Sequence, residues 1–285
     1  MAEQHMIPGR FGVVGNPIKH SLSPVIHAAF ADQIGQTIDY QRHHVDLDAF
    51  ESWVDAFFDQ GGRGLNITLP FKTRAFDLAC DTSDRARVAG AANFLCRNVD
   101  GRICADNTDG TGLIRDMRGS AGWSLTNARI LVLGAGGAVK GVVSSLLAER
   151  PQCLFVANRT AERATALTED WRDQDVPVEG GGYNDIGSEA WDLIINGTST
   201  GLSGEMPNLP AFLALAPACR CYDMAYGSEP TPFMAWSTDH GVDDVRDGLG
   251  MLVEQAAESF YLWLGQRPQT RPVIDSLRAL KSAPL

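Results

Sequence analysis

The chain has 285 residues, which is enough for one large domain or two ordinary ones. Its 44% hydrophobic and 21% charged residues are typical of a globular protein in water. The formal net charge of −11 disfavours nucleic acids and anionic membranes as partners, and no apolar run has the roughly 18 residues of a membrane span. Without a signal-like start or a Cys-x-x-Cys pair among its six cysteines, we expect a cytoplasmic protein with reduced thiols and no bound metal.

The first hundred residues alternate between predicted strands and helices. Strands are expected at Phe11–Gly15, Tyr40–Val45 and Gly64–Ile67, and helices at Ser23–Ala31 and Asp48–Phe58. Ser23 followed by Pro24 is typical of a helix cap and a first helical residue. The dipeptide Asp100-Gly101 predicts a hairpin that joins Asn93–Arg97 to Arg102–Cys104. We therefore expect a mixed α/β unit with some antiparallel pairing.

Two hydroxyl groups lie at the entrance of the first predicted helix, within the polar segment 15–24. Ser21 and Ser23 stand two residues apart there, where unpaired backbone N–H groups favour an anion. The pair can therefore bind a carboxylate without a cation. Ser23 could equally be only the helix cap, and both interpretations stay open at this point.

Lysine is scarce in this chain, which draws attention to Lys72. Of the 24 lysine and arginine residues only four are lysines, and lysine, unlike arginine, can give up its proton in a protein. Lys72 follows the segment Asn66–Phe71 and begins a predicted helix, at the end that disfavours a charged lysine. We expect Lys72 to exchange a proton with a substrate. Asp109, in the polar segment 106–110, would either orient Lys72 or share a proton with a substrate hydroxyl.

A predicted βαβ unit begins after a helix expected at Thr111–Met117. The buried strand Arg129–Leu133 leads into the glycine-rich turn 134–138, and a helix at Val139–Glu149 and a strand at Leu154–Ala157 follow. The N-terminus of the helix in such a unit can hold a pyrophosphate. The strict Gly-x-Gly-x-x-Gly spacing is not met, so the glycines alone are also compatible with a simple tight turn.

The residues after the second strand of this unit indicate which cofactor it binds. An acidic residue usually lies there and binds the ribose 2′-hydroxyl of NAD. This chain has Asn158 instead, followed by Arg159, Thr160 and Arg163. Guanidinium groups bind a 2′-phosphate that a carboxylate would repel, so the sequence predicts NADP rather than NAD. The alternative is that both arginines only form the solvated start of a helix.

Further strands are expected at Leu193–Ile195 and Cys221–Met224, and helices at Met251–Leu264 and Pro272–Leu280. We expect residues 1–110, completed by the helices in 249–285, to form a substrate-binding and catalytic domain. Residues 111–248 would form a Rossmann-like NADP-binding domain, with a cleft between the two. The fold class expected is therefore a two-domain α/β protein.

In combination the motifs resemble those of the shikimate dehydrogenase family, from Gly12 to about residue 265. They are Gly-Asn-Pro-Ile-x-His-Ser-x-Ser-Pro, Asn-Ile-Thr-Leu-Pro-Phe-Lys, Asp-Asn-Thr-Asp-Gly, Gly-Ala-Gly-Gly-Ala, Asn-Arg-Thr-x-x-Arg and Asp-Gly-Leu-Gly-Met-Leu-Val-x-Gln. The resemblance implies reversible reduction of 3-dehydroshikimate to shikimate with NADPH, as in aromatic amino-acid and chorismate biosynthesis.

The resemblance also implies roles for individual residues. Lys72 and Asp109 would be the catalytic pair. The substrate would be bound by Ser21, Ser23, Asn66, Thr68, Asn93, Tyr226 and Gln255. The cofactor would be bound by Gly134, Ala135, Gly136, Gly137, Ala138, Asn158, Arg159, Thr160, Arg163, Met224, Gly248 and Asp84. No partner beyond the small-molecule substrate is implied, and the protein would be a monomer or a homodimer.

One departure from the family pattern leaves the substrate open. The family usually has threonine after the hairpin asparagine, and this chain has Phe94. A bulky apolar side chain next to Asn93 could reshape the pocket, which would favour a paralogue that oxidises quinate or an aminated analogue of shikimate. A further alternative is a non-catalytic NADPH-binding regulator on the same fold, although it would not need Lys72 and Asp109.

Overall fold

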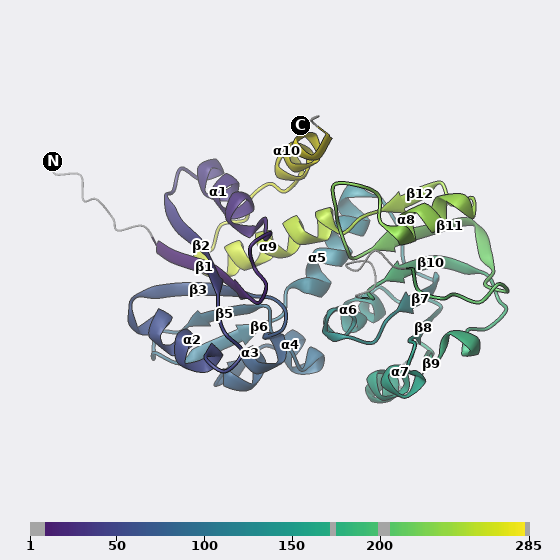
Figure 1. Cartoon of the computed structure of the whole chain (residues 1–285), viewed down its shortest axis with the longest axis horizontal. Helices are drawn as coiled ribbons and strands as arrows, with labels where there is room; N and C mark the ends of the chain where they lie inside the picture. The colour runs from purple at the N-terminus through teal and green to yellow at the C-terminus, as the bar shows by residue number, and fades with distance from the viewer. Residues whose placement is uncertain (1–8, 172–174, 199–205, 283–285) are drawn as a thin grey trace. The chain divides into compact units, whose positions relative to one another are not determined.

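The chain forms two compact units in the computed structural model, which describes residues 9–171, 175–198 and 206–282. The first unit comprises Met1–Asp109 and Val253–Leu277, and the second comprises Gly110–Leu252 and Arg278–Leu285. Each unit is built around one six-stranded sheet (Figure 1). No helix in the described ranges combines the length and the apolar character needed to cross a bilayer.

The sheet of the first unit is mixed, as the sequence predicts. Its strands, in the order β2-β1-β3-β5-β6-β4, are β1 (Gly9–Gly15), β2 (Ile38–His44), β3 (Gly62–Ile67), β4 (Asp81–Thr82), β5 (Phe94–Arg97) and β6 (Ile103–Asp106). Strand β5 pairs antiparallel with both β3 and β6, while β1 pairs parallel with β2 and β3. The β5–β6 pairing is the predicted hairpin, and Gly101 takes the positive φ of 80° that its turn requires.

Helices cover both faces of this sheet. They are α1 (Ser23–Gln33), α2 (Phe50–Asp59), α3 (Lys72–Leu78), α4 (Asp84–Ala89) and the later part of α9 (Leu249–Leu264). Leu65 and Leu95 of the sheet pack with Phe57 of α2 on one face. On the other face Trp263 of α9 packs with Phe11. Because strand side chains alternate between faces, β1 supplies Val14 to the core that contains Phe57 and Phe11 to the core that contains Trp263.

The second sheet is entirely parallel and has the Rossmann strand order. Its strands, in the order β12-β11-β10-β7-β8-β9, are β7 (Arg129–Leu133), β8 (Cys153–Ala157), β9 (Val178–Gly181), β10 (Trp191–Asn196), β11 (Leu215–Asp223) and β12 (Asp244–Arg246). Counted from β7, this is the order 6-5-4-1-2-3, which reverses between β7 and β10. Ligands of such sheets bind at the carboxyl ends of the strands beside this reversal.

Both faces of the second sheet are buried, and its central strands are accordingly almost wholly apolar. The helices of this unit are α5 (Asp109–Arg115), α6 (Gly137–Ala148), α7 (Ala161–Thr168), α8 (Pro232–Asp239) and the first turn of α9. Val142 of α6 packs with Ile130 and Val132 on one face, and Phe233 of α8 packs with Leu131 on the other. Helix α10 (Arg271–Ser282) ends the described chain (Figure 1).

One local expectation is wrong. Ser23 is not the helix cap: Leu22 holds that position, and its side chain makes no capping hydrogen bond in the described part of the chain. The Ser23 hydroxyl instead accepts a hydrogen bond from the Ser21 hydroxyl at 3.1 Å. The helix expected at Thr111–Met117 is confirmed: it begins as α5 and continues after Arg115 as the π-helical turn Asp116–Ser120, in which Asp116 is buried.

The buried Asp116 makes Gly250 sensitive to substitution. A Cβ at Gly250 would lie 2.0 Å from Oδ1 of Asp116, whose Oδ2 accepts a hydrogen bond from the Tyr222 hydroxyl at 2.8 Å. Gly250→Ala must therefore displace the carboxylate and break a buried hydrogen bond, and we expect the free energy of unfolding to fall by about 1–3 kcal/mol.

Urea unfolding of Gly250→Ala checks this, with Gly119→Ala as the matched control. Gly119 lies in the same π-helical turn as Asp116, and a Cβ there meets no heavy atom within 4 Å. Equal stabilities of the two variants would contradict the expected clash.

Candidate functional site

Lys72 and Asp109 are in contact in the first unit, where they follow the carboxyl ends of β3 and β6. Each is the first residue of a helix, Lys72 of α3 and Asp109 of α5. Lys72 Nζ lies 2.5 Å from Asp109 Oδ2, and the two side chains are only 18% and 8% exposed. Asp109 Oδ1 accepts a second hydrogen bond, from Asn93 Nδ2 at 2.8 Å. The amide thus holds the carboxylate in place while the ammonium group keeps some access to solvent.

Asn93 connects this pair to helix α9. Its Nδ2 also approaches Gln255 Oε1 at 3.1 Å, and its Oδ1 accepts from the backbone N–H of Thr108 at 2.8 Å. The Thr108 hydroxyl contacts Asn93 as well, at 2.9 Å from Nδ2. The structure therefore brings four residues of one cluster together: Lys72, Asn93, Asp109 and Gln255. Thr108 belongs with them, and its place inside the Asp-Asn-Thr-Asp-Gly motif is the signal that could have identified it.

Ser21, Ser23 and Thr68 carry the remaining hydroxyls expected on the substrate side. Ser21 is half-buried and Ser23 is buried, and the backbone N–H of Ser23 donates to the Ser21 hydroxyl at 3.3 Å. Thr68 directly follows β3, and its backbone N–H donates to the carbonyl of Val14 at 2.9 Å. Its hydroxyl makes no hydrogen bond to any described residue, which leaves it available to a ligand.

Asn66 is placed differently from the other expected ligands, because its amide is fully occupied by the protein. Its Oδ1 is approached by Tyr40 Oη at 2.8 Å and by His27 Nε2 at 3.1 Å. Its Nδ2 donates to the Asn93 carbonyl at 3.2 Å and to Ser259 Oγ at 2.9 Å. An amide has two donors and two acceptor sites, and all four are used here. Sequence reasoning missed Tyr40, His27 and Ser259, whose residue types are equally common in cores.

Phe94, the departure from the family pattern, belongs to the core. It is 4% exposed and stacks on Trp263, with ring centroids 5.2 Å apart and an interplanar angle of 24°. Trp263 lies eight residues beyond Gln255 on α9, which is about 12 Å along a helix axis. The ring of Phe94 therefore packs on the indole of Trp263 in the core of the first unit.

The glycine-rich turn of the second unit has the features of a phosphate site. Gly134 follows β7 with a φ of 102°, and a Cβ there would lie 3.0 Å from the Gly197 carbonyl oxygen. Gly136 and Gly137 are exposed, and a Cβ at either would meet no heavy atom of the described residues within 4 Å. Within the described ranges the space beside these glycines is therefore open, and the cap residue Gly136 offers no side chain to the first N–H groups of α6. Together with Ala135 and Ala138, these residues fit a pyrophosphate.

The residues predicted to determine the preference for NADP over NAD follow β8. Asn158 Nδ2 donates to the Thr160 carbonyl at 2.9 Å, which shapes the turn into α7. Arg159 and Arg163 are both exposed, and among the described residues neither guanidinium forms an ion pair or a hydrogen bond. Two unpaired guanidinium groups and no carboxylate at Asn158 fit the 2′-phosphate of NADP.

Met224, Gly248 and Tyr226 lie beyond β11. The N–H of Gly248 donates to the Ala225 carbonyl at 2.9 Å, and a Cβ at Gly248 would lie 2.2 Å from the Met224 carbonyl oxygen. Met224 and Gly248 are thus in direct contact. Tyr226 is half-buried, and burial raises the pKa of its hydroxyl. Asp84, also expected near the cofactor, begins α4 in the first unit, where its 93% exposed carboxylate pairs with Arg87 at 2.5 Å.

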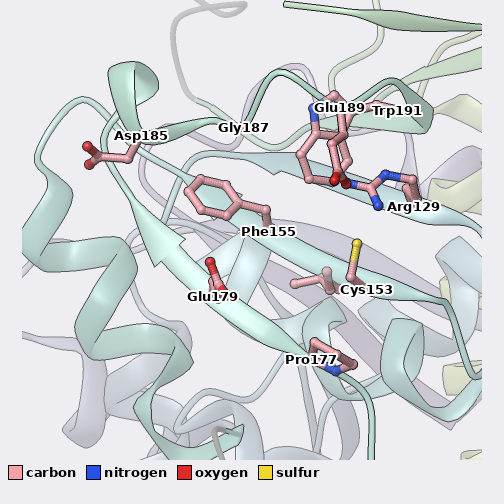
Figure 2. Close-up of a pocket in the computed structure, with 10 residues that line it drawn as sticks. Arg129, Cys153, Phe155, Pro177, Glu179, Asp185, Gly187, Glu189 and Trp191 are labelled. Carbon is pink, nitrogen blue, oxygen red and sulfur yellow. The ribbon is translucent and has the colours of Figure 1, made fainter.

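A pocket of about 320 Å³ lies elsewhere in the second unit (Figure 2). Its lining includes Arg129, Cys153 and Trp191, which are the first residues of β7, β8 and β10. It is therefore at the amino ends of the strands, whereas the glycine-rich turn follows their carboxyl ends. This position makes it a poor candidate for the cofactor site.

Three family models match the chain. The shikimate dehydrogenase substrate binding domain matches residues 13–95, the shikimate/quinate 5-dehydrogenase model matches residues 117–201, and the shikimate 5′-dehydrogenase C-terminal domain matches residues 248–278. The curated shikimate dehydrogenase (NADP(+)) of Methylococcus capsulatus is 53% identical over 272 residues, which are 95% of this chain and 97% of that protein.

Solved structures agree with these matches. An Ael1 enzyme from Pseudomonas putida has a TM-score of 0.87 at 43% identity, over 94% of this chain and 98% of that one. The shikimate 5-dehydrogenase of Thermus thermophilus in complex with NADP(H) and shikimate has a TM-score of 0.82 at 30% identity, over 95% of this chain and 99% of that one.

Proposed function

This chain belongs to the shikimate dehydrogenase family, and from that premise we propose that it reversibly reduces 3-dehydroshikimate to shikimate with NADPH. The observation that carries the proposal is the contact of 2.5 Å between Lys72 Nζ and Asp109 Oδ2. We further propose that the protein acts in the cytoplasm, as a monomer or a homodimer.

Different residues of the first unit are proposed to bind different groups of the substrate. Ser21, Ser23 and Thr68 offer uncharged hydroxyls, which suit a carboxylate and ring hydroxyls. Asn93 and Gln255 hold their amides beside the catalytic pair, at 3.1 Å from one another. A ring bound among them would be positioned by several short hydrogen bonds, which orients it for reaction. Tyr226, whose hydroxyl stays protonated, is proposed as a further donor to the carboxylate.

Lys72 and Asp109 are proposed to move the proton. NADPH, when bound, supplies the hydride that the carbonyl carbon receives. The carbonyl oxygen gains negative charge at that moment and takes a proton from the Lys72 ammonium group. Asp109, fixed by Asn93 at 2.8 Å, keeps that ammonium group oriented. In the reverse direction Lys72 accepts the proton of the shikimate hydroxyl, and its 18% exposure allows exchange with solvent.

The second unit is proposed to bind the cofactor through two sets of residues. The open turn at Gly134–Ala138 would hold the pyrophosphate, and Arg159 with Arg163 would hold the 2′-phosphate. Met224 and Gly248, which touch each other beyond β11, are proposed to line the nicotinamide. Asp84, whose carboxylate pairs with Arg87, is proposed to lie near the cofactor.

The direct test follows nicotinamide absorbance while the purified protein oxidises shikimate, quinate or an aminated analogue, each with NADP and with NAD. We expect rapid turnover of shikimate with NADP and little with NAD. Faster turnover of quinate or of the aminated analogue than of shikimate would overturn the substrate. Cofactor binding without turnover of any of the three would indicate a binding protein.

A further inference from the structure

Asp106 is a buried carboxylate that the proposed reaction does not use, although it stands three residues before Asp109. It is the last residue of β6, and its side chain is 12% exposed. Its Oδ1 accepts hydrogen bonds from Ser83 Oγ at 2.5 Å and from the backbone N–H of Asn107 at 2.6 Å. A buried charge needs such partners, because it is costly to remove from water without them. A further partner is Arg85, on α4.

Arg85 binds the Asp106 carboxylate through two hydrogen bonds. Its Nε lies 3.0 Å from Asp106 Oδ1 and its Nη2 lies 2.6 Å from Oδ2, which is the paired geometry that guanidinium groups offer. Burial raises the pKa of Asp106, but the hydrogen bonds from Arg85 and Ser83 outweigh burial and hold this pKa below its ordinary value. The carboxylate is therefore charged at neutral pH, and Arg85 fixes both of its oxygens.

Two hydrogen bonds connect this carboxylate to the backbone of Asp109. The backbone N–H of Asn107 donates to Asp106 Oδ1, and Asn107 Oδ1 accepts from the backbone N–H of Asp109 at 3.1 Å. The other side of the Asn107 amide donates to the Ala91 carbonyl at 3.0 Å. The start of α5 at Asp109 is therefore held, through Asn107, by the carboxylate that Arg85 binds.

The backbone carbonyl of Asp106 holds a second residue of the site. It accepts a hydrogen bond from the backbone N–H of Asn93 at 3.1 Å, and Asn93 Nδ2 donates to Asp109 Oδ1 at 2.8 Å. Asp106 thus contacts both residues that determine where Asp109 lies. Asn107 fixes its backbone, and Asn93 fixes its carboxylate.

We propose that Arg85 is a positioning residue, which fixes Asp106 and through it holds the Asp109 carboxylate against the Lys72 ammonium group. Two hydrogen bonds from one guanidinium group set the plane of the Asp106 carboxylate, whereas a lysine would act as a point charge and leave that plane free to turn. This inference rests on the proposed function, because it takes Lys72 and Asp109 as the pair that moves the proton.

The test replaces Arg85 and measures the rate of NADP reduction by shikimate in single turnovers of the full chain. We expect this rate to fall by about tenfold to 100-fold in Arg85→Gln, because a small misplacement of a reacting group has an effect of this size. Arg85→Lys keeps the charge, so the buried carboxylate retains a counterion and the variant should fold. Its rate should recover only in part, to about threefold to tenfold below that of the wild type. KM for NADP should not change, since the glycine-rich turn, Arg159 and Arg163 lie in the second unit.

Arg267→Lys is the matched control. Arg267 Nη2 lies 2.8 Å from Glu258, a buried carboxylate that Arg85 also contacts, at 3.3 Å. The side chains of Arg267 and Arg85 are similarly exposed, at 40% and 35%. The control weakens an ion pair in the same group of charges and leaves both bonds from Arg85 to Asp106 intact. It should lower the melting temperature about as much as Arg85→Lys does, but its single-turnover rate should stay within twofold of the wild type.

The double variant Arg85→Lys/Lys72→Ala separates positioning from a general loss of structure. If Arg85 acts by holding Asp109 against Lys72, its replacement should change the rate little once Lys72 is absent. The effects of the two single variants should then not add. A general distortion of the first unit would instead lower the rate by the same factor with and without Lys72.

Each contrary result has a separate meaning. Equal single-turnover rates in Arg85→Lys and Arg267→Lys would overturn the inference, and so would additive effects of Arg85→Lys and Lys72→Ala. In both cases the proposed function stands, because the wild-type protein still oxidises shikimate. A wild-type protein that does not turn over shikimate would overturn the proposed function, and this inference with it.

Discussion

Replacing Lys72 with alanine is expected to lower the turnover of shikimate by about 100-fold or more, which is the usual contribution of general acid–base catalysis. The variant loses the group that lies 2.5 Å from Asp109 and leaves no other described lysine beside that carboxylate. Cofactor binding should persist, because the glycine-rich turn and both arginines lie in the second unit. Stopped-flow turnover and a fluorescence titration with NADPH measure the two quantities separately.

Lys72→Arg is the matched variant for this experiment. Arginine keeps the positive charge next to Asp109 but effectively cannot give up a proton. If Lys72 transfers a proton, the arginine variant should be nearly as inactive as the alanine variant. Recovery of most of the activity by arginine would mean that only the charge matters. A loss of less than tenfold in Lys72→Ala would remove the residue from the proposed role.

The double variant Arg159→Ala/Arg163→Ala is expected to lose most of the preference for NADP over NAD. Each guanidinium that binds a phosphate is worth about 1.5–3 kcal/mol, so KM for NADP should rise by at least about tenfold. KM for NAD should change little, because NAD has no 2′-phosphate. Both side chains are exposed and unpaired within the described ranges, so the fold should not suffer.

Steady-state kinetics with both cofactors test this expectation, with Arg118→Ala as the control. Arg118 lies in the same unit, is 62% exposed and, among the described residues, forms an ion pair with Glu149. Its removal changes the net charge by one unit without removing a predicted phosphate ligand. A similar rise in KM for NADP in the control would attribute the effect to overall charge, and equal losses with NAD and NADP would contradict the assignment.

Much of the fold could be predicted from local patterns. The apolar run at Arg129–Leu133 ends in glycines, and β7 has the same bounds as the expected strand. The hairpin around Gly101 could be predicted because its turn chemistry is local. The edge strands β9 and β12 were not expected, since Val-Glu-Gly-Gly and Asp-Val-Arg contain no apolar run and are held by pairing with a neighbouring strand.

The residues of the site could be predicted from the sequence, but most of the hydrogen bonds between them could not. Motifs named Lys72, Asn93 and Gln255, but no local pattern shows that Asn66 is fully bound inside the protein or that Ser259 is one of its partners. The expectation for Ser23 as a helix cap failed for a similar reason. A serine before a proline favours a cap locally, whereas in the structure Leu22 holds the cap position and the Ser23 hydroxyl accepts from Ser21.

The path of the chain also determines when the substrate site can exist during synthesis. Asn66 forms a hydrogen bond with Ser259, 193 positions later in the chain, and Asn93 forms one with Gln255, 162 positions later. Both partners lie on α9. A ribosome that adds about 5–20 residues per second has by then made all six strands of the second sheet. Until α9 emerges, Phe11 and Phe94 lack the indole of Trp263 that covers them. A premature stop at residue 253 would thus keep the glycine-rich turn and both arginines but leave one apolar face of the first sheet exposed. We expect such a truncated chain to be bound by chaperones or degraded, and to be inactive.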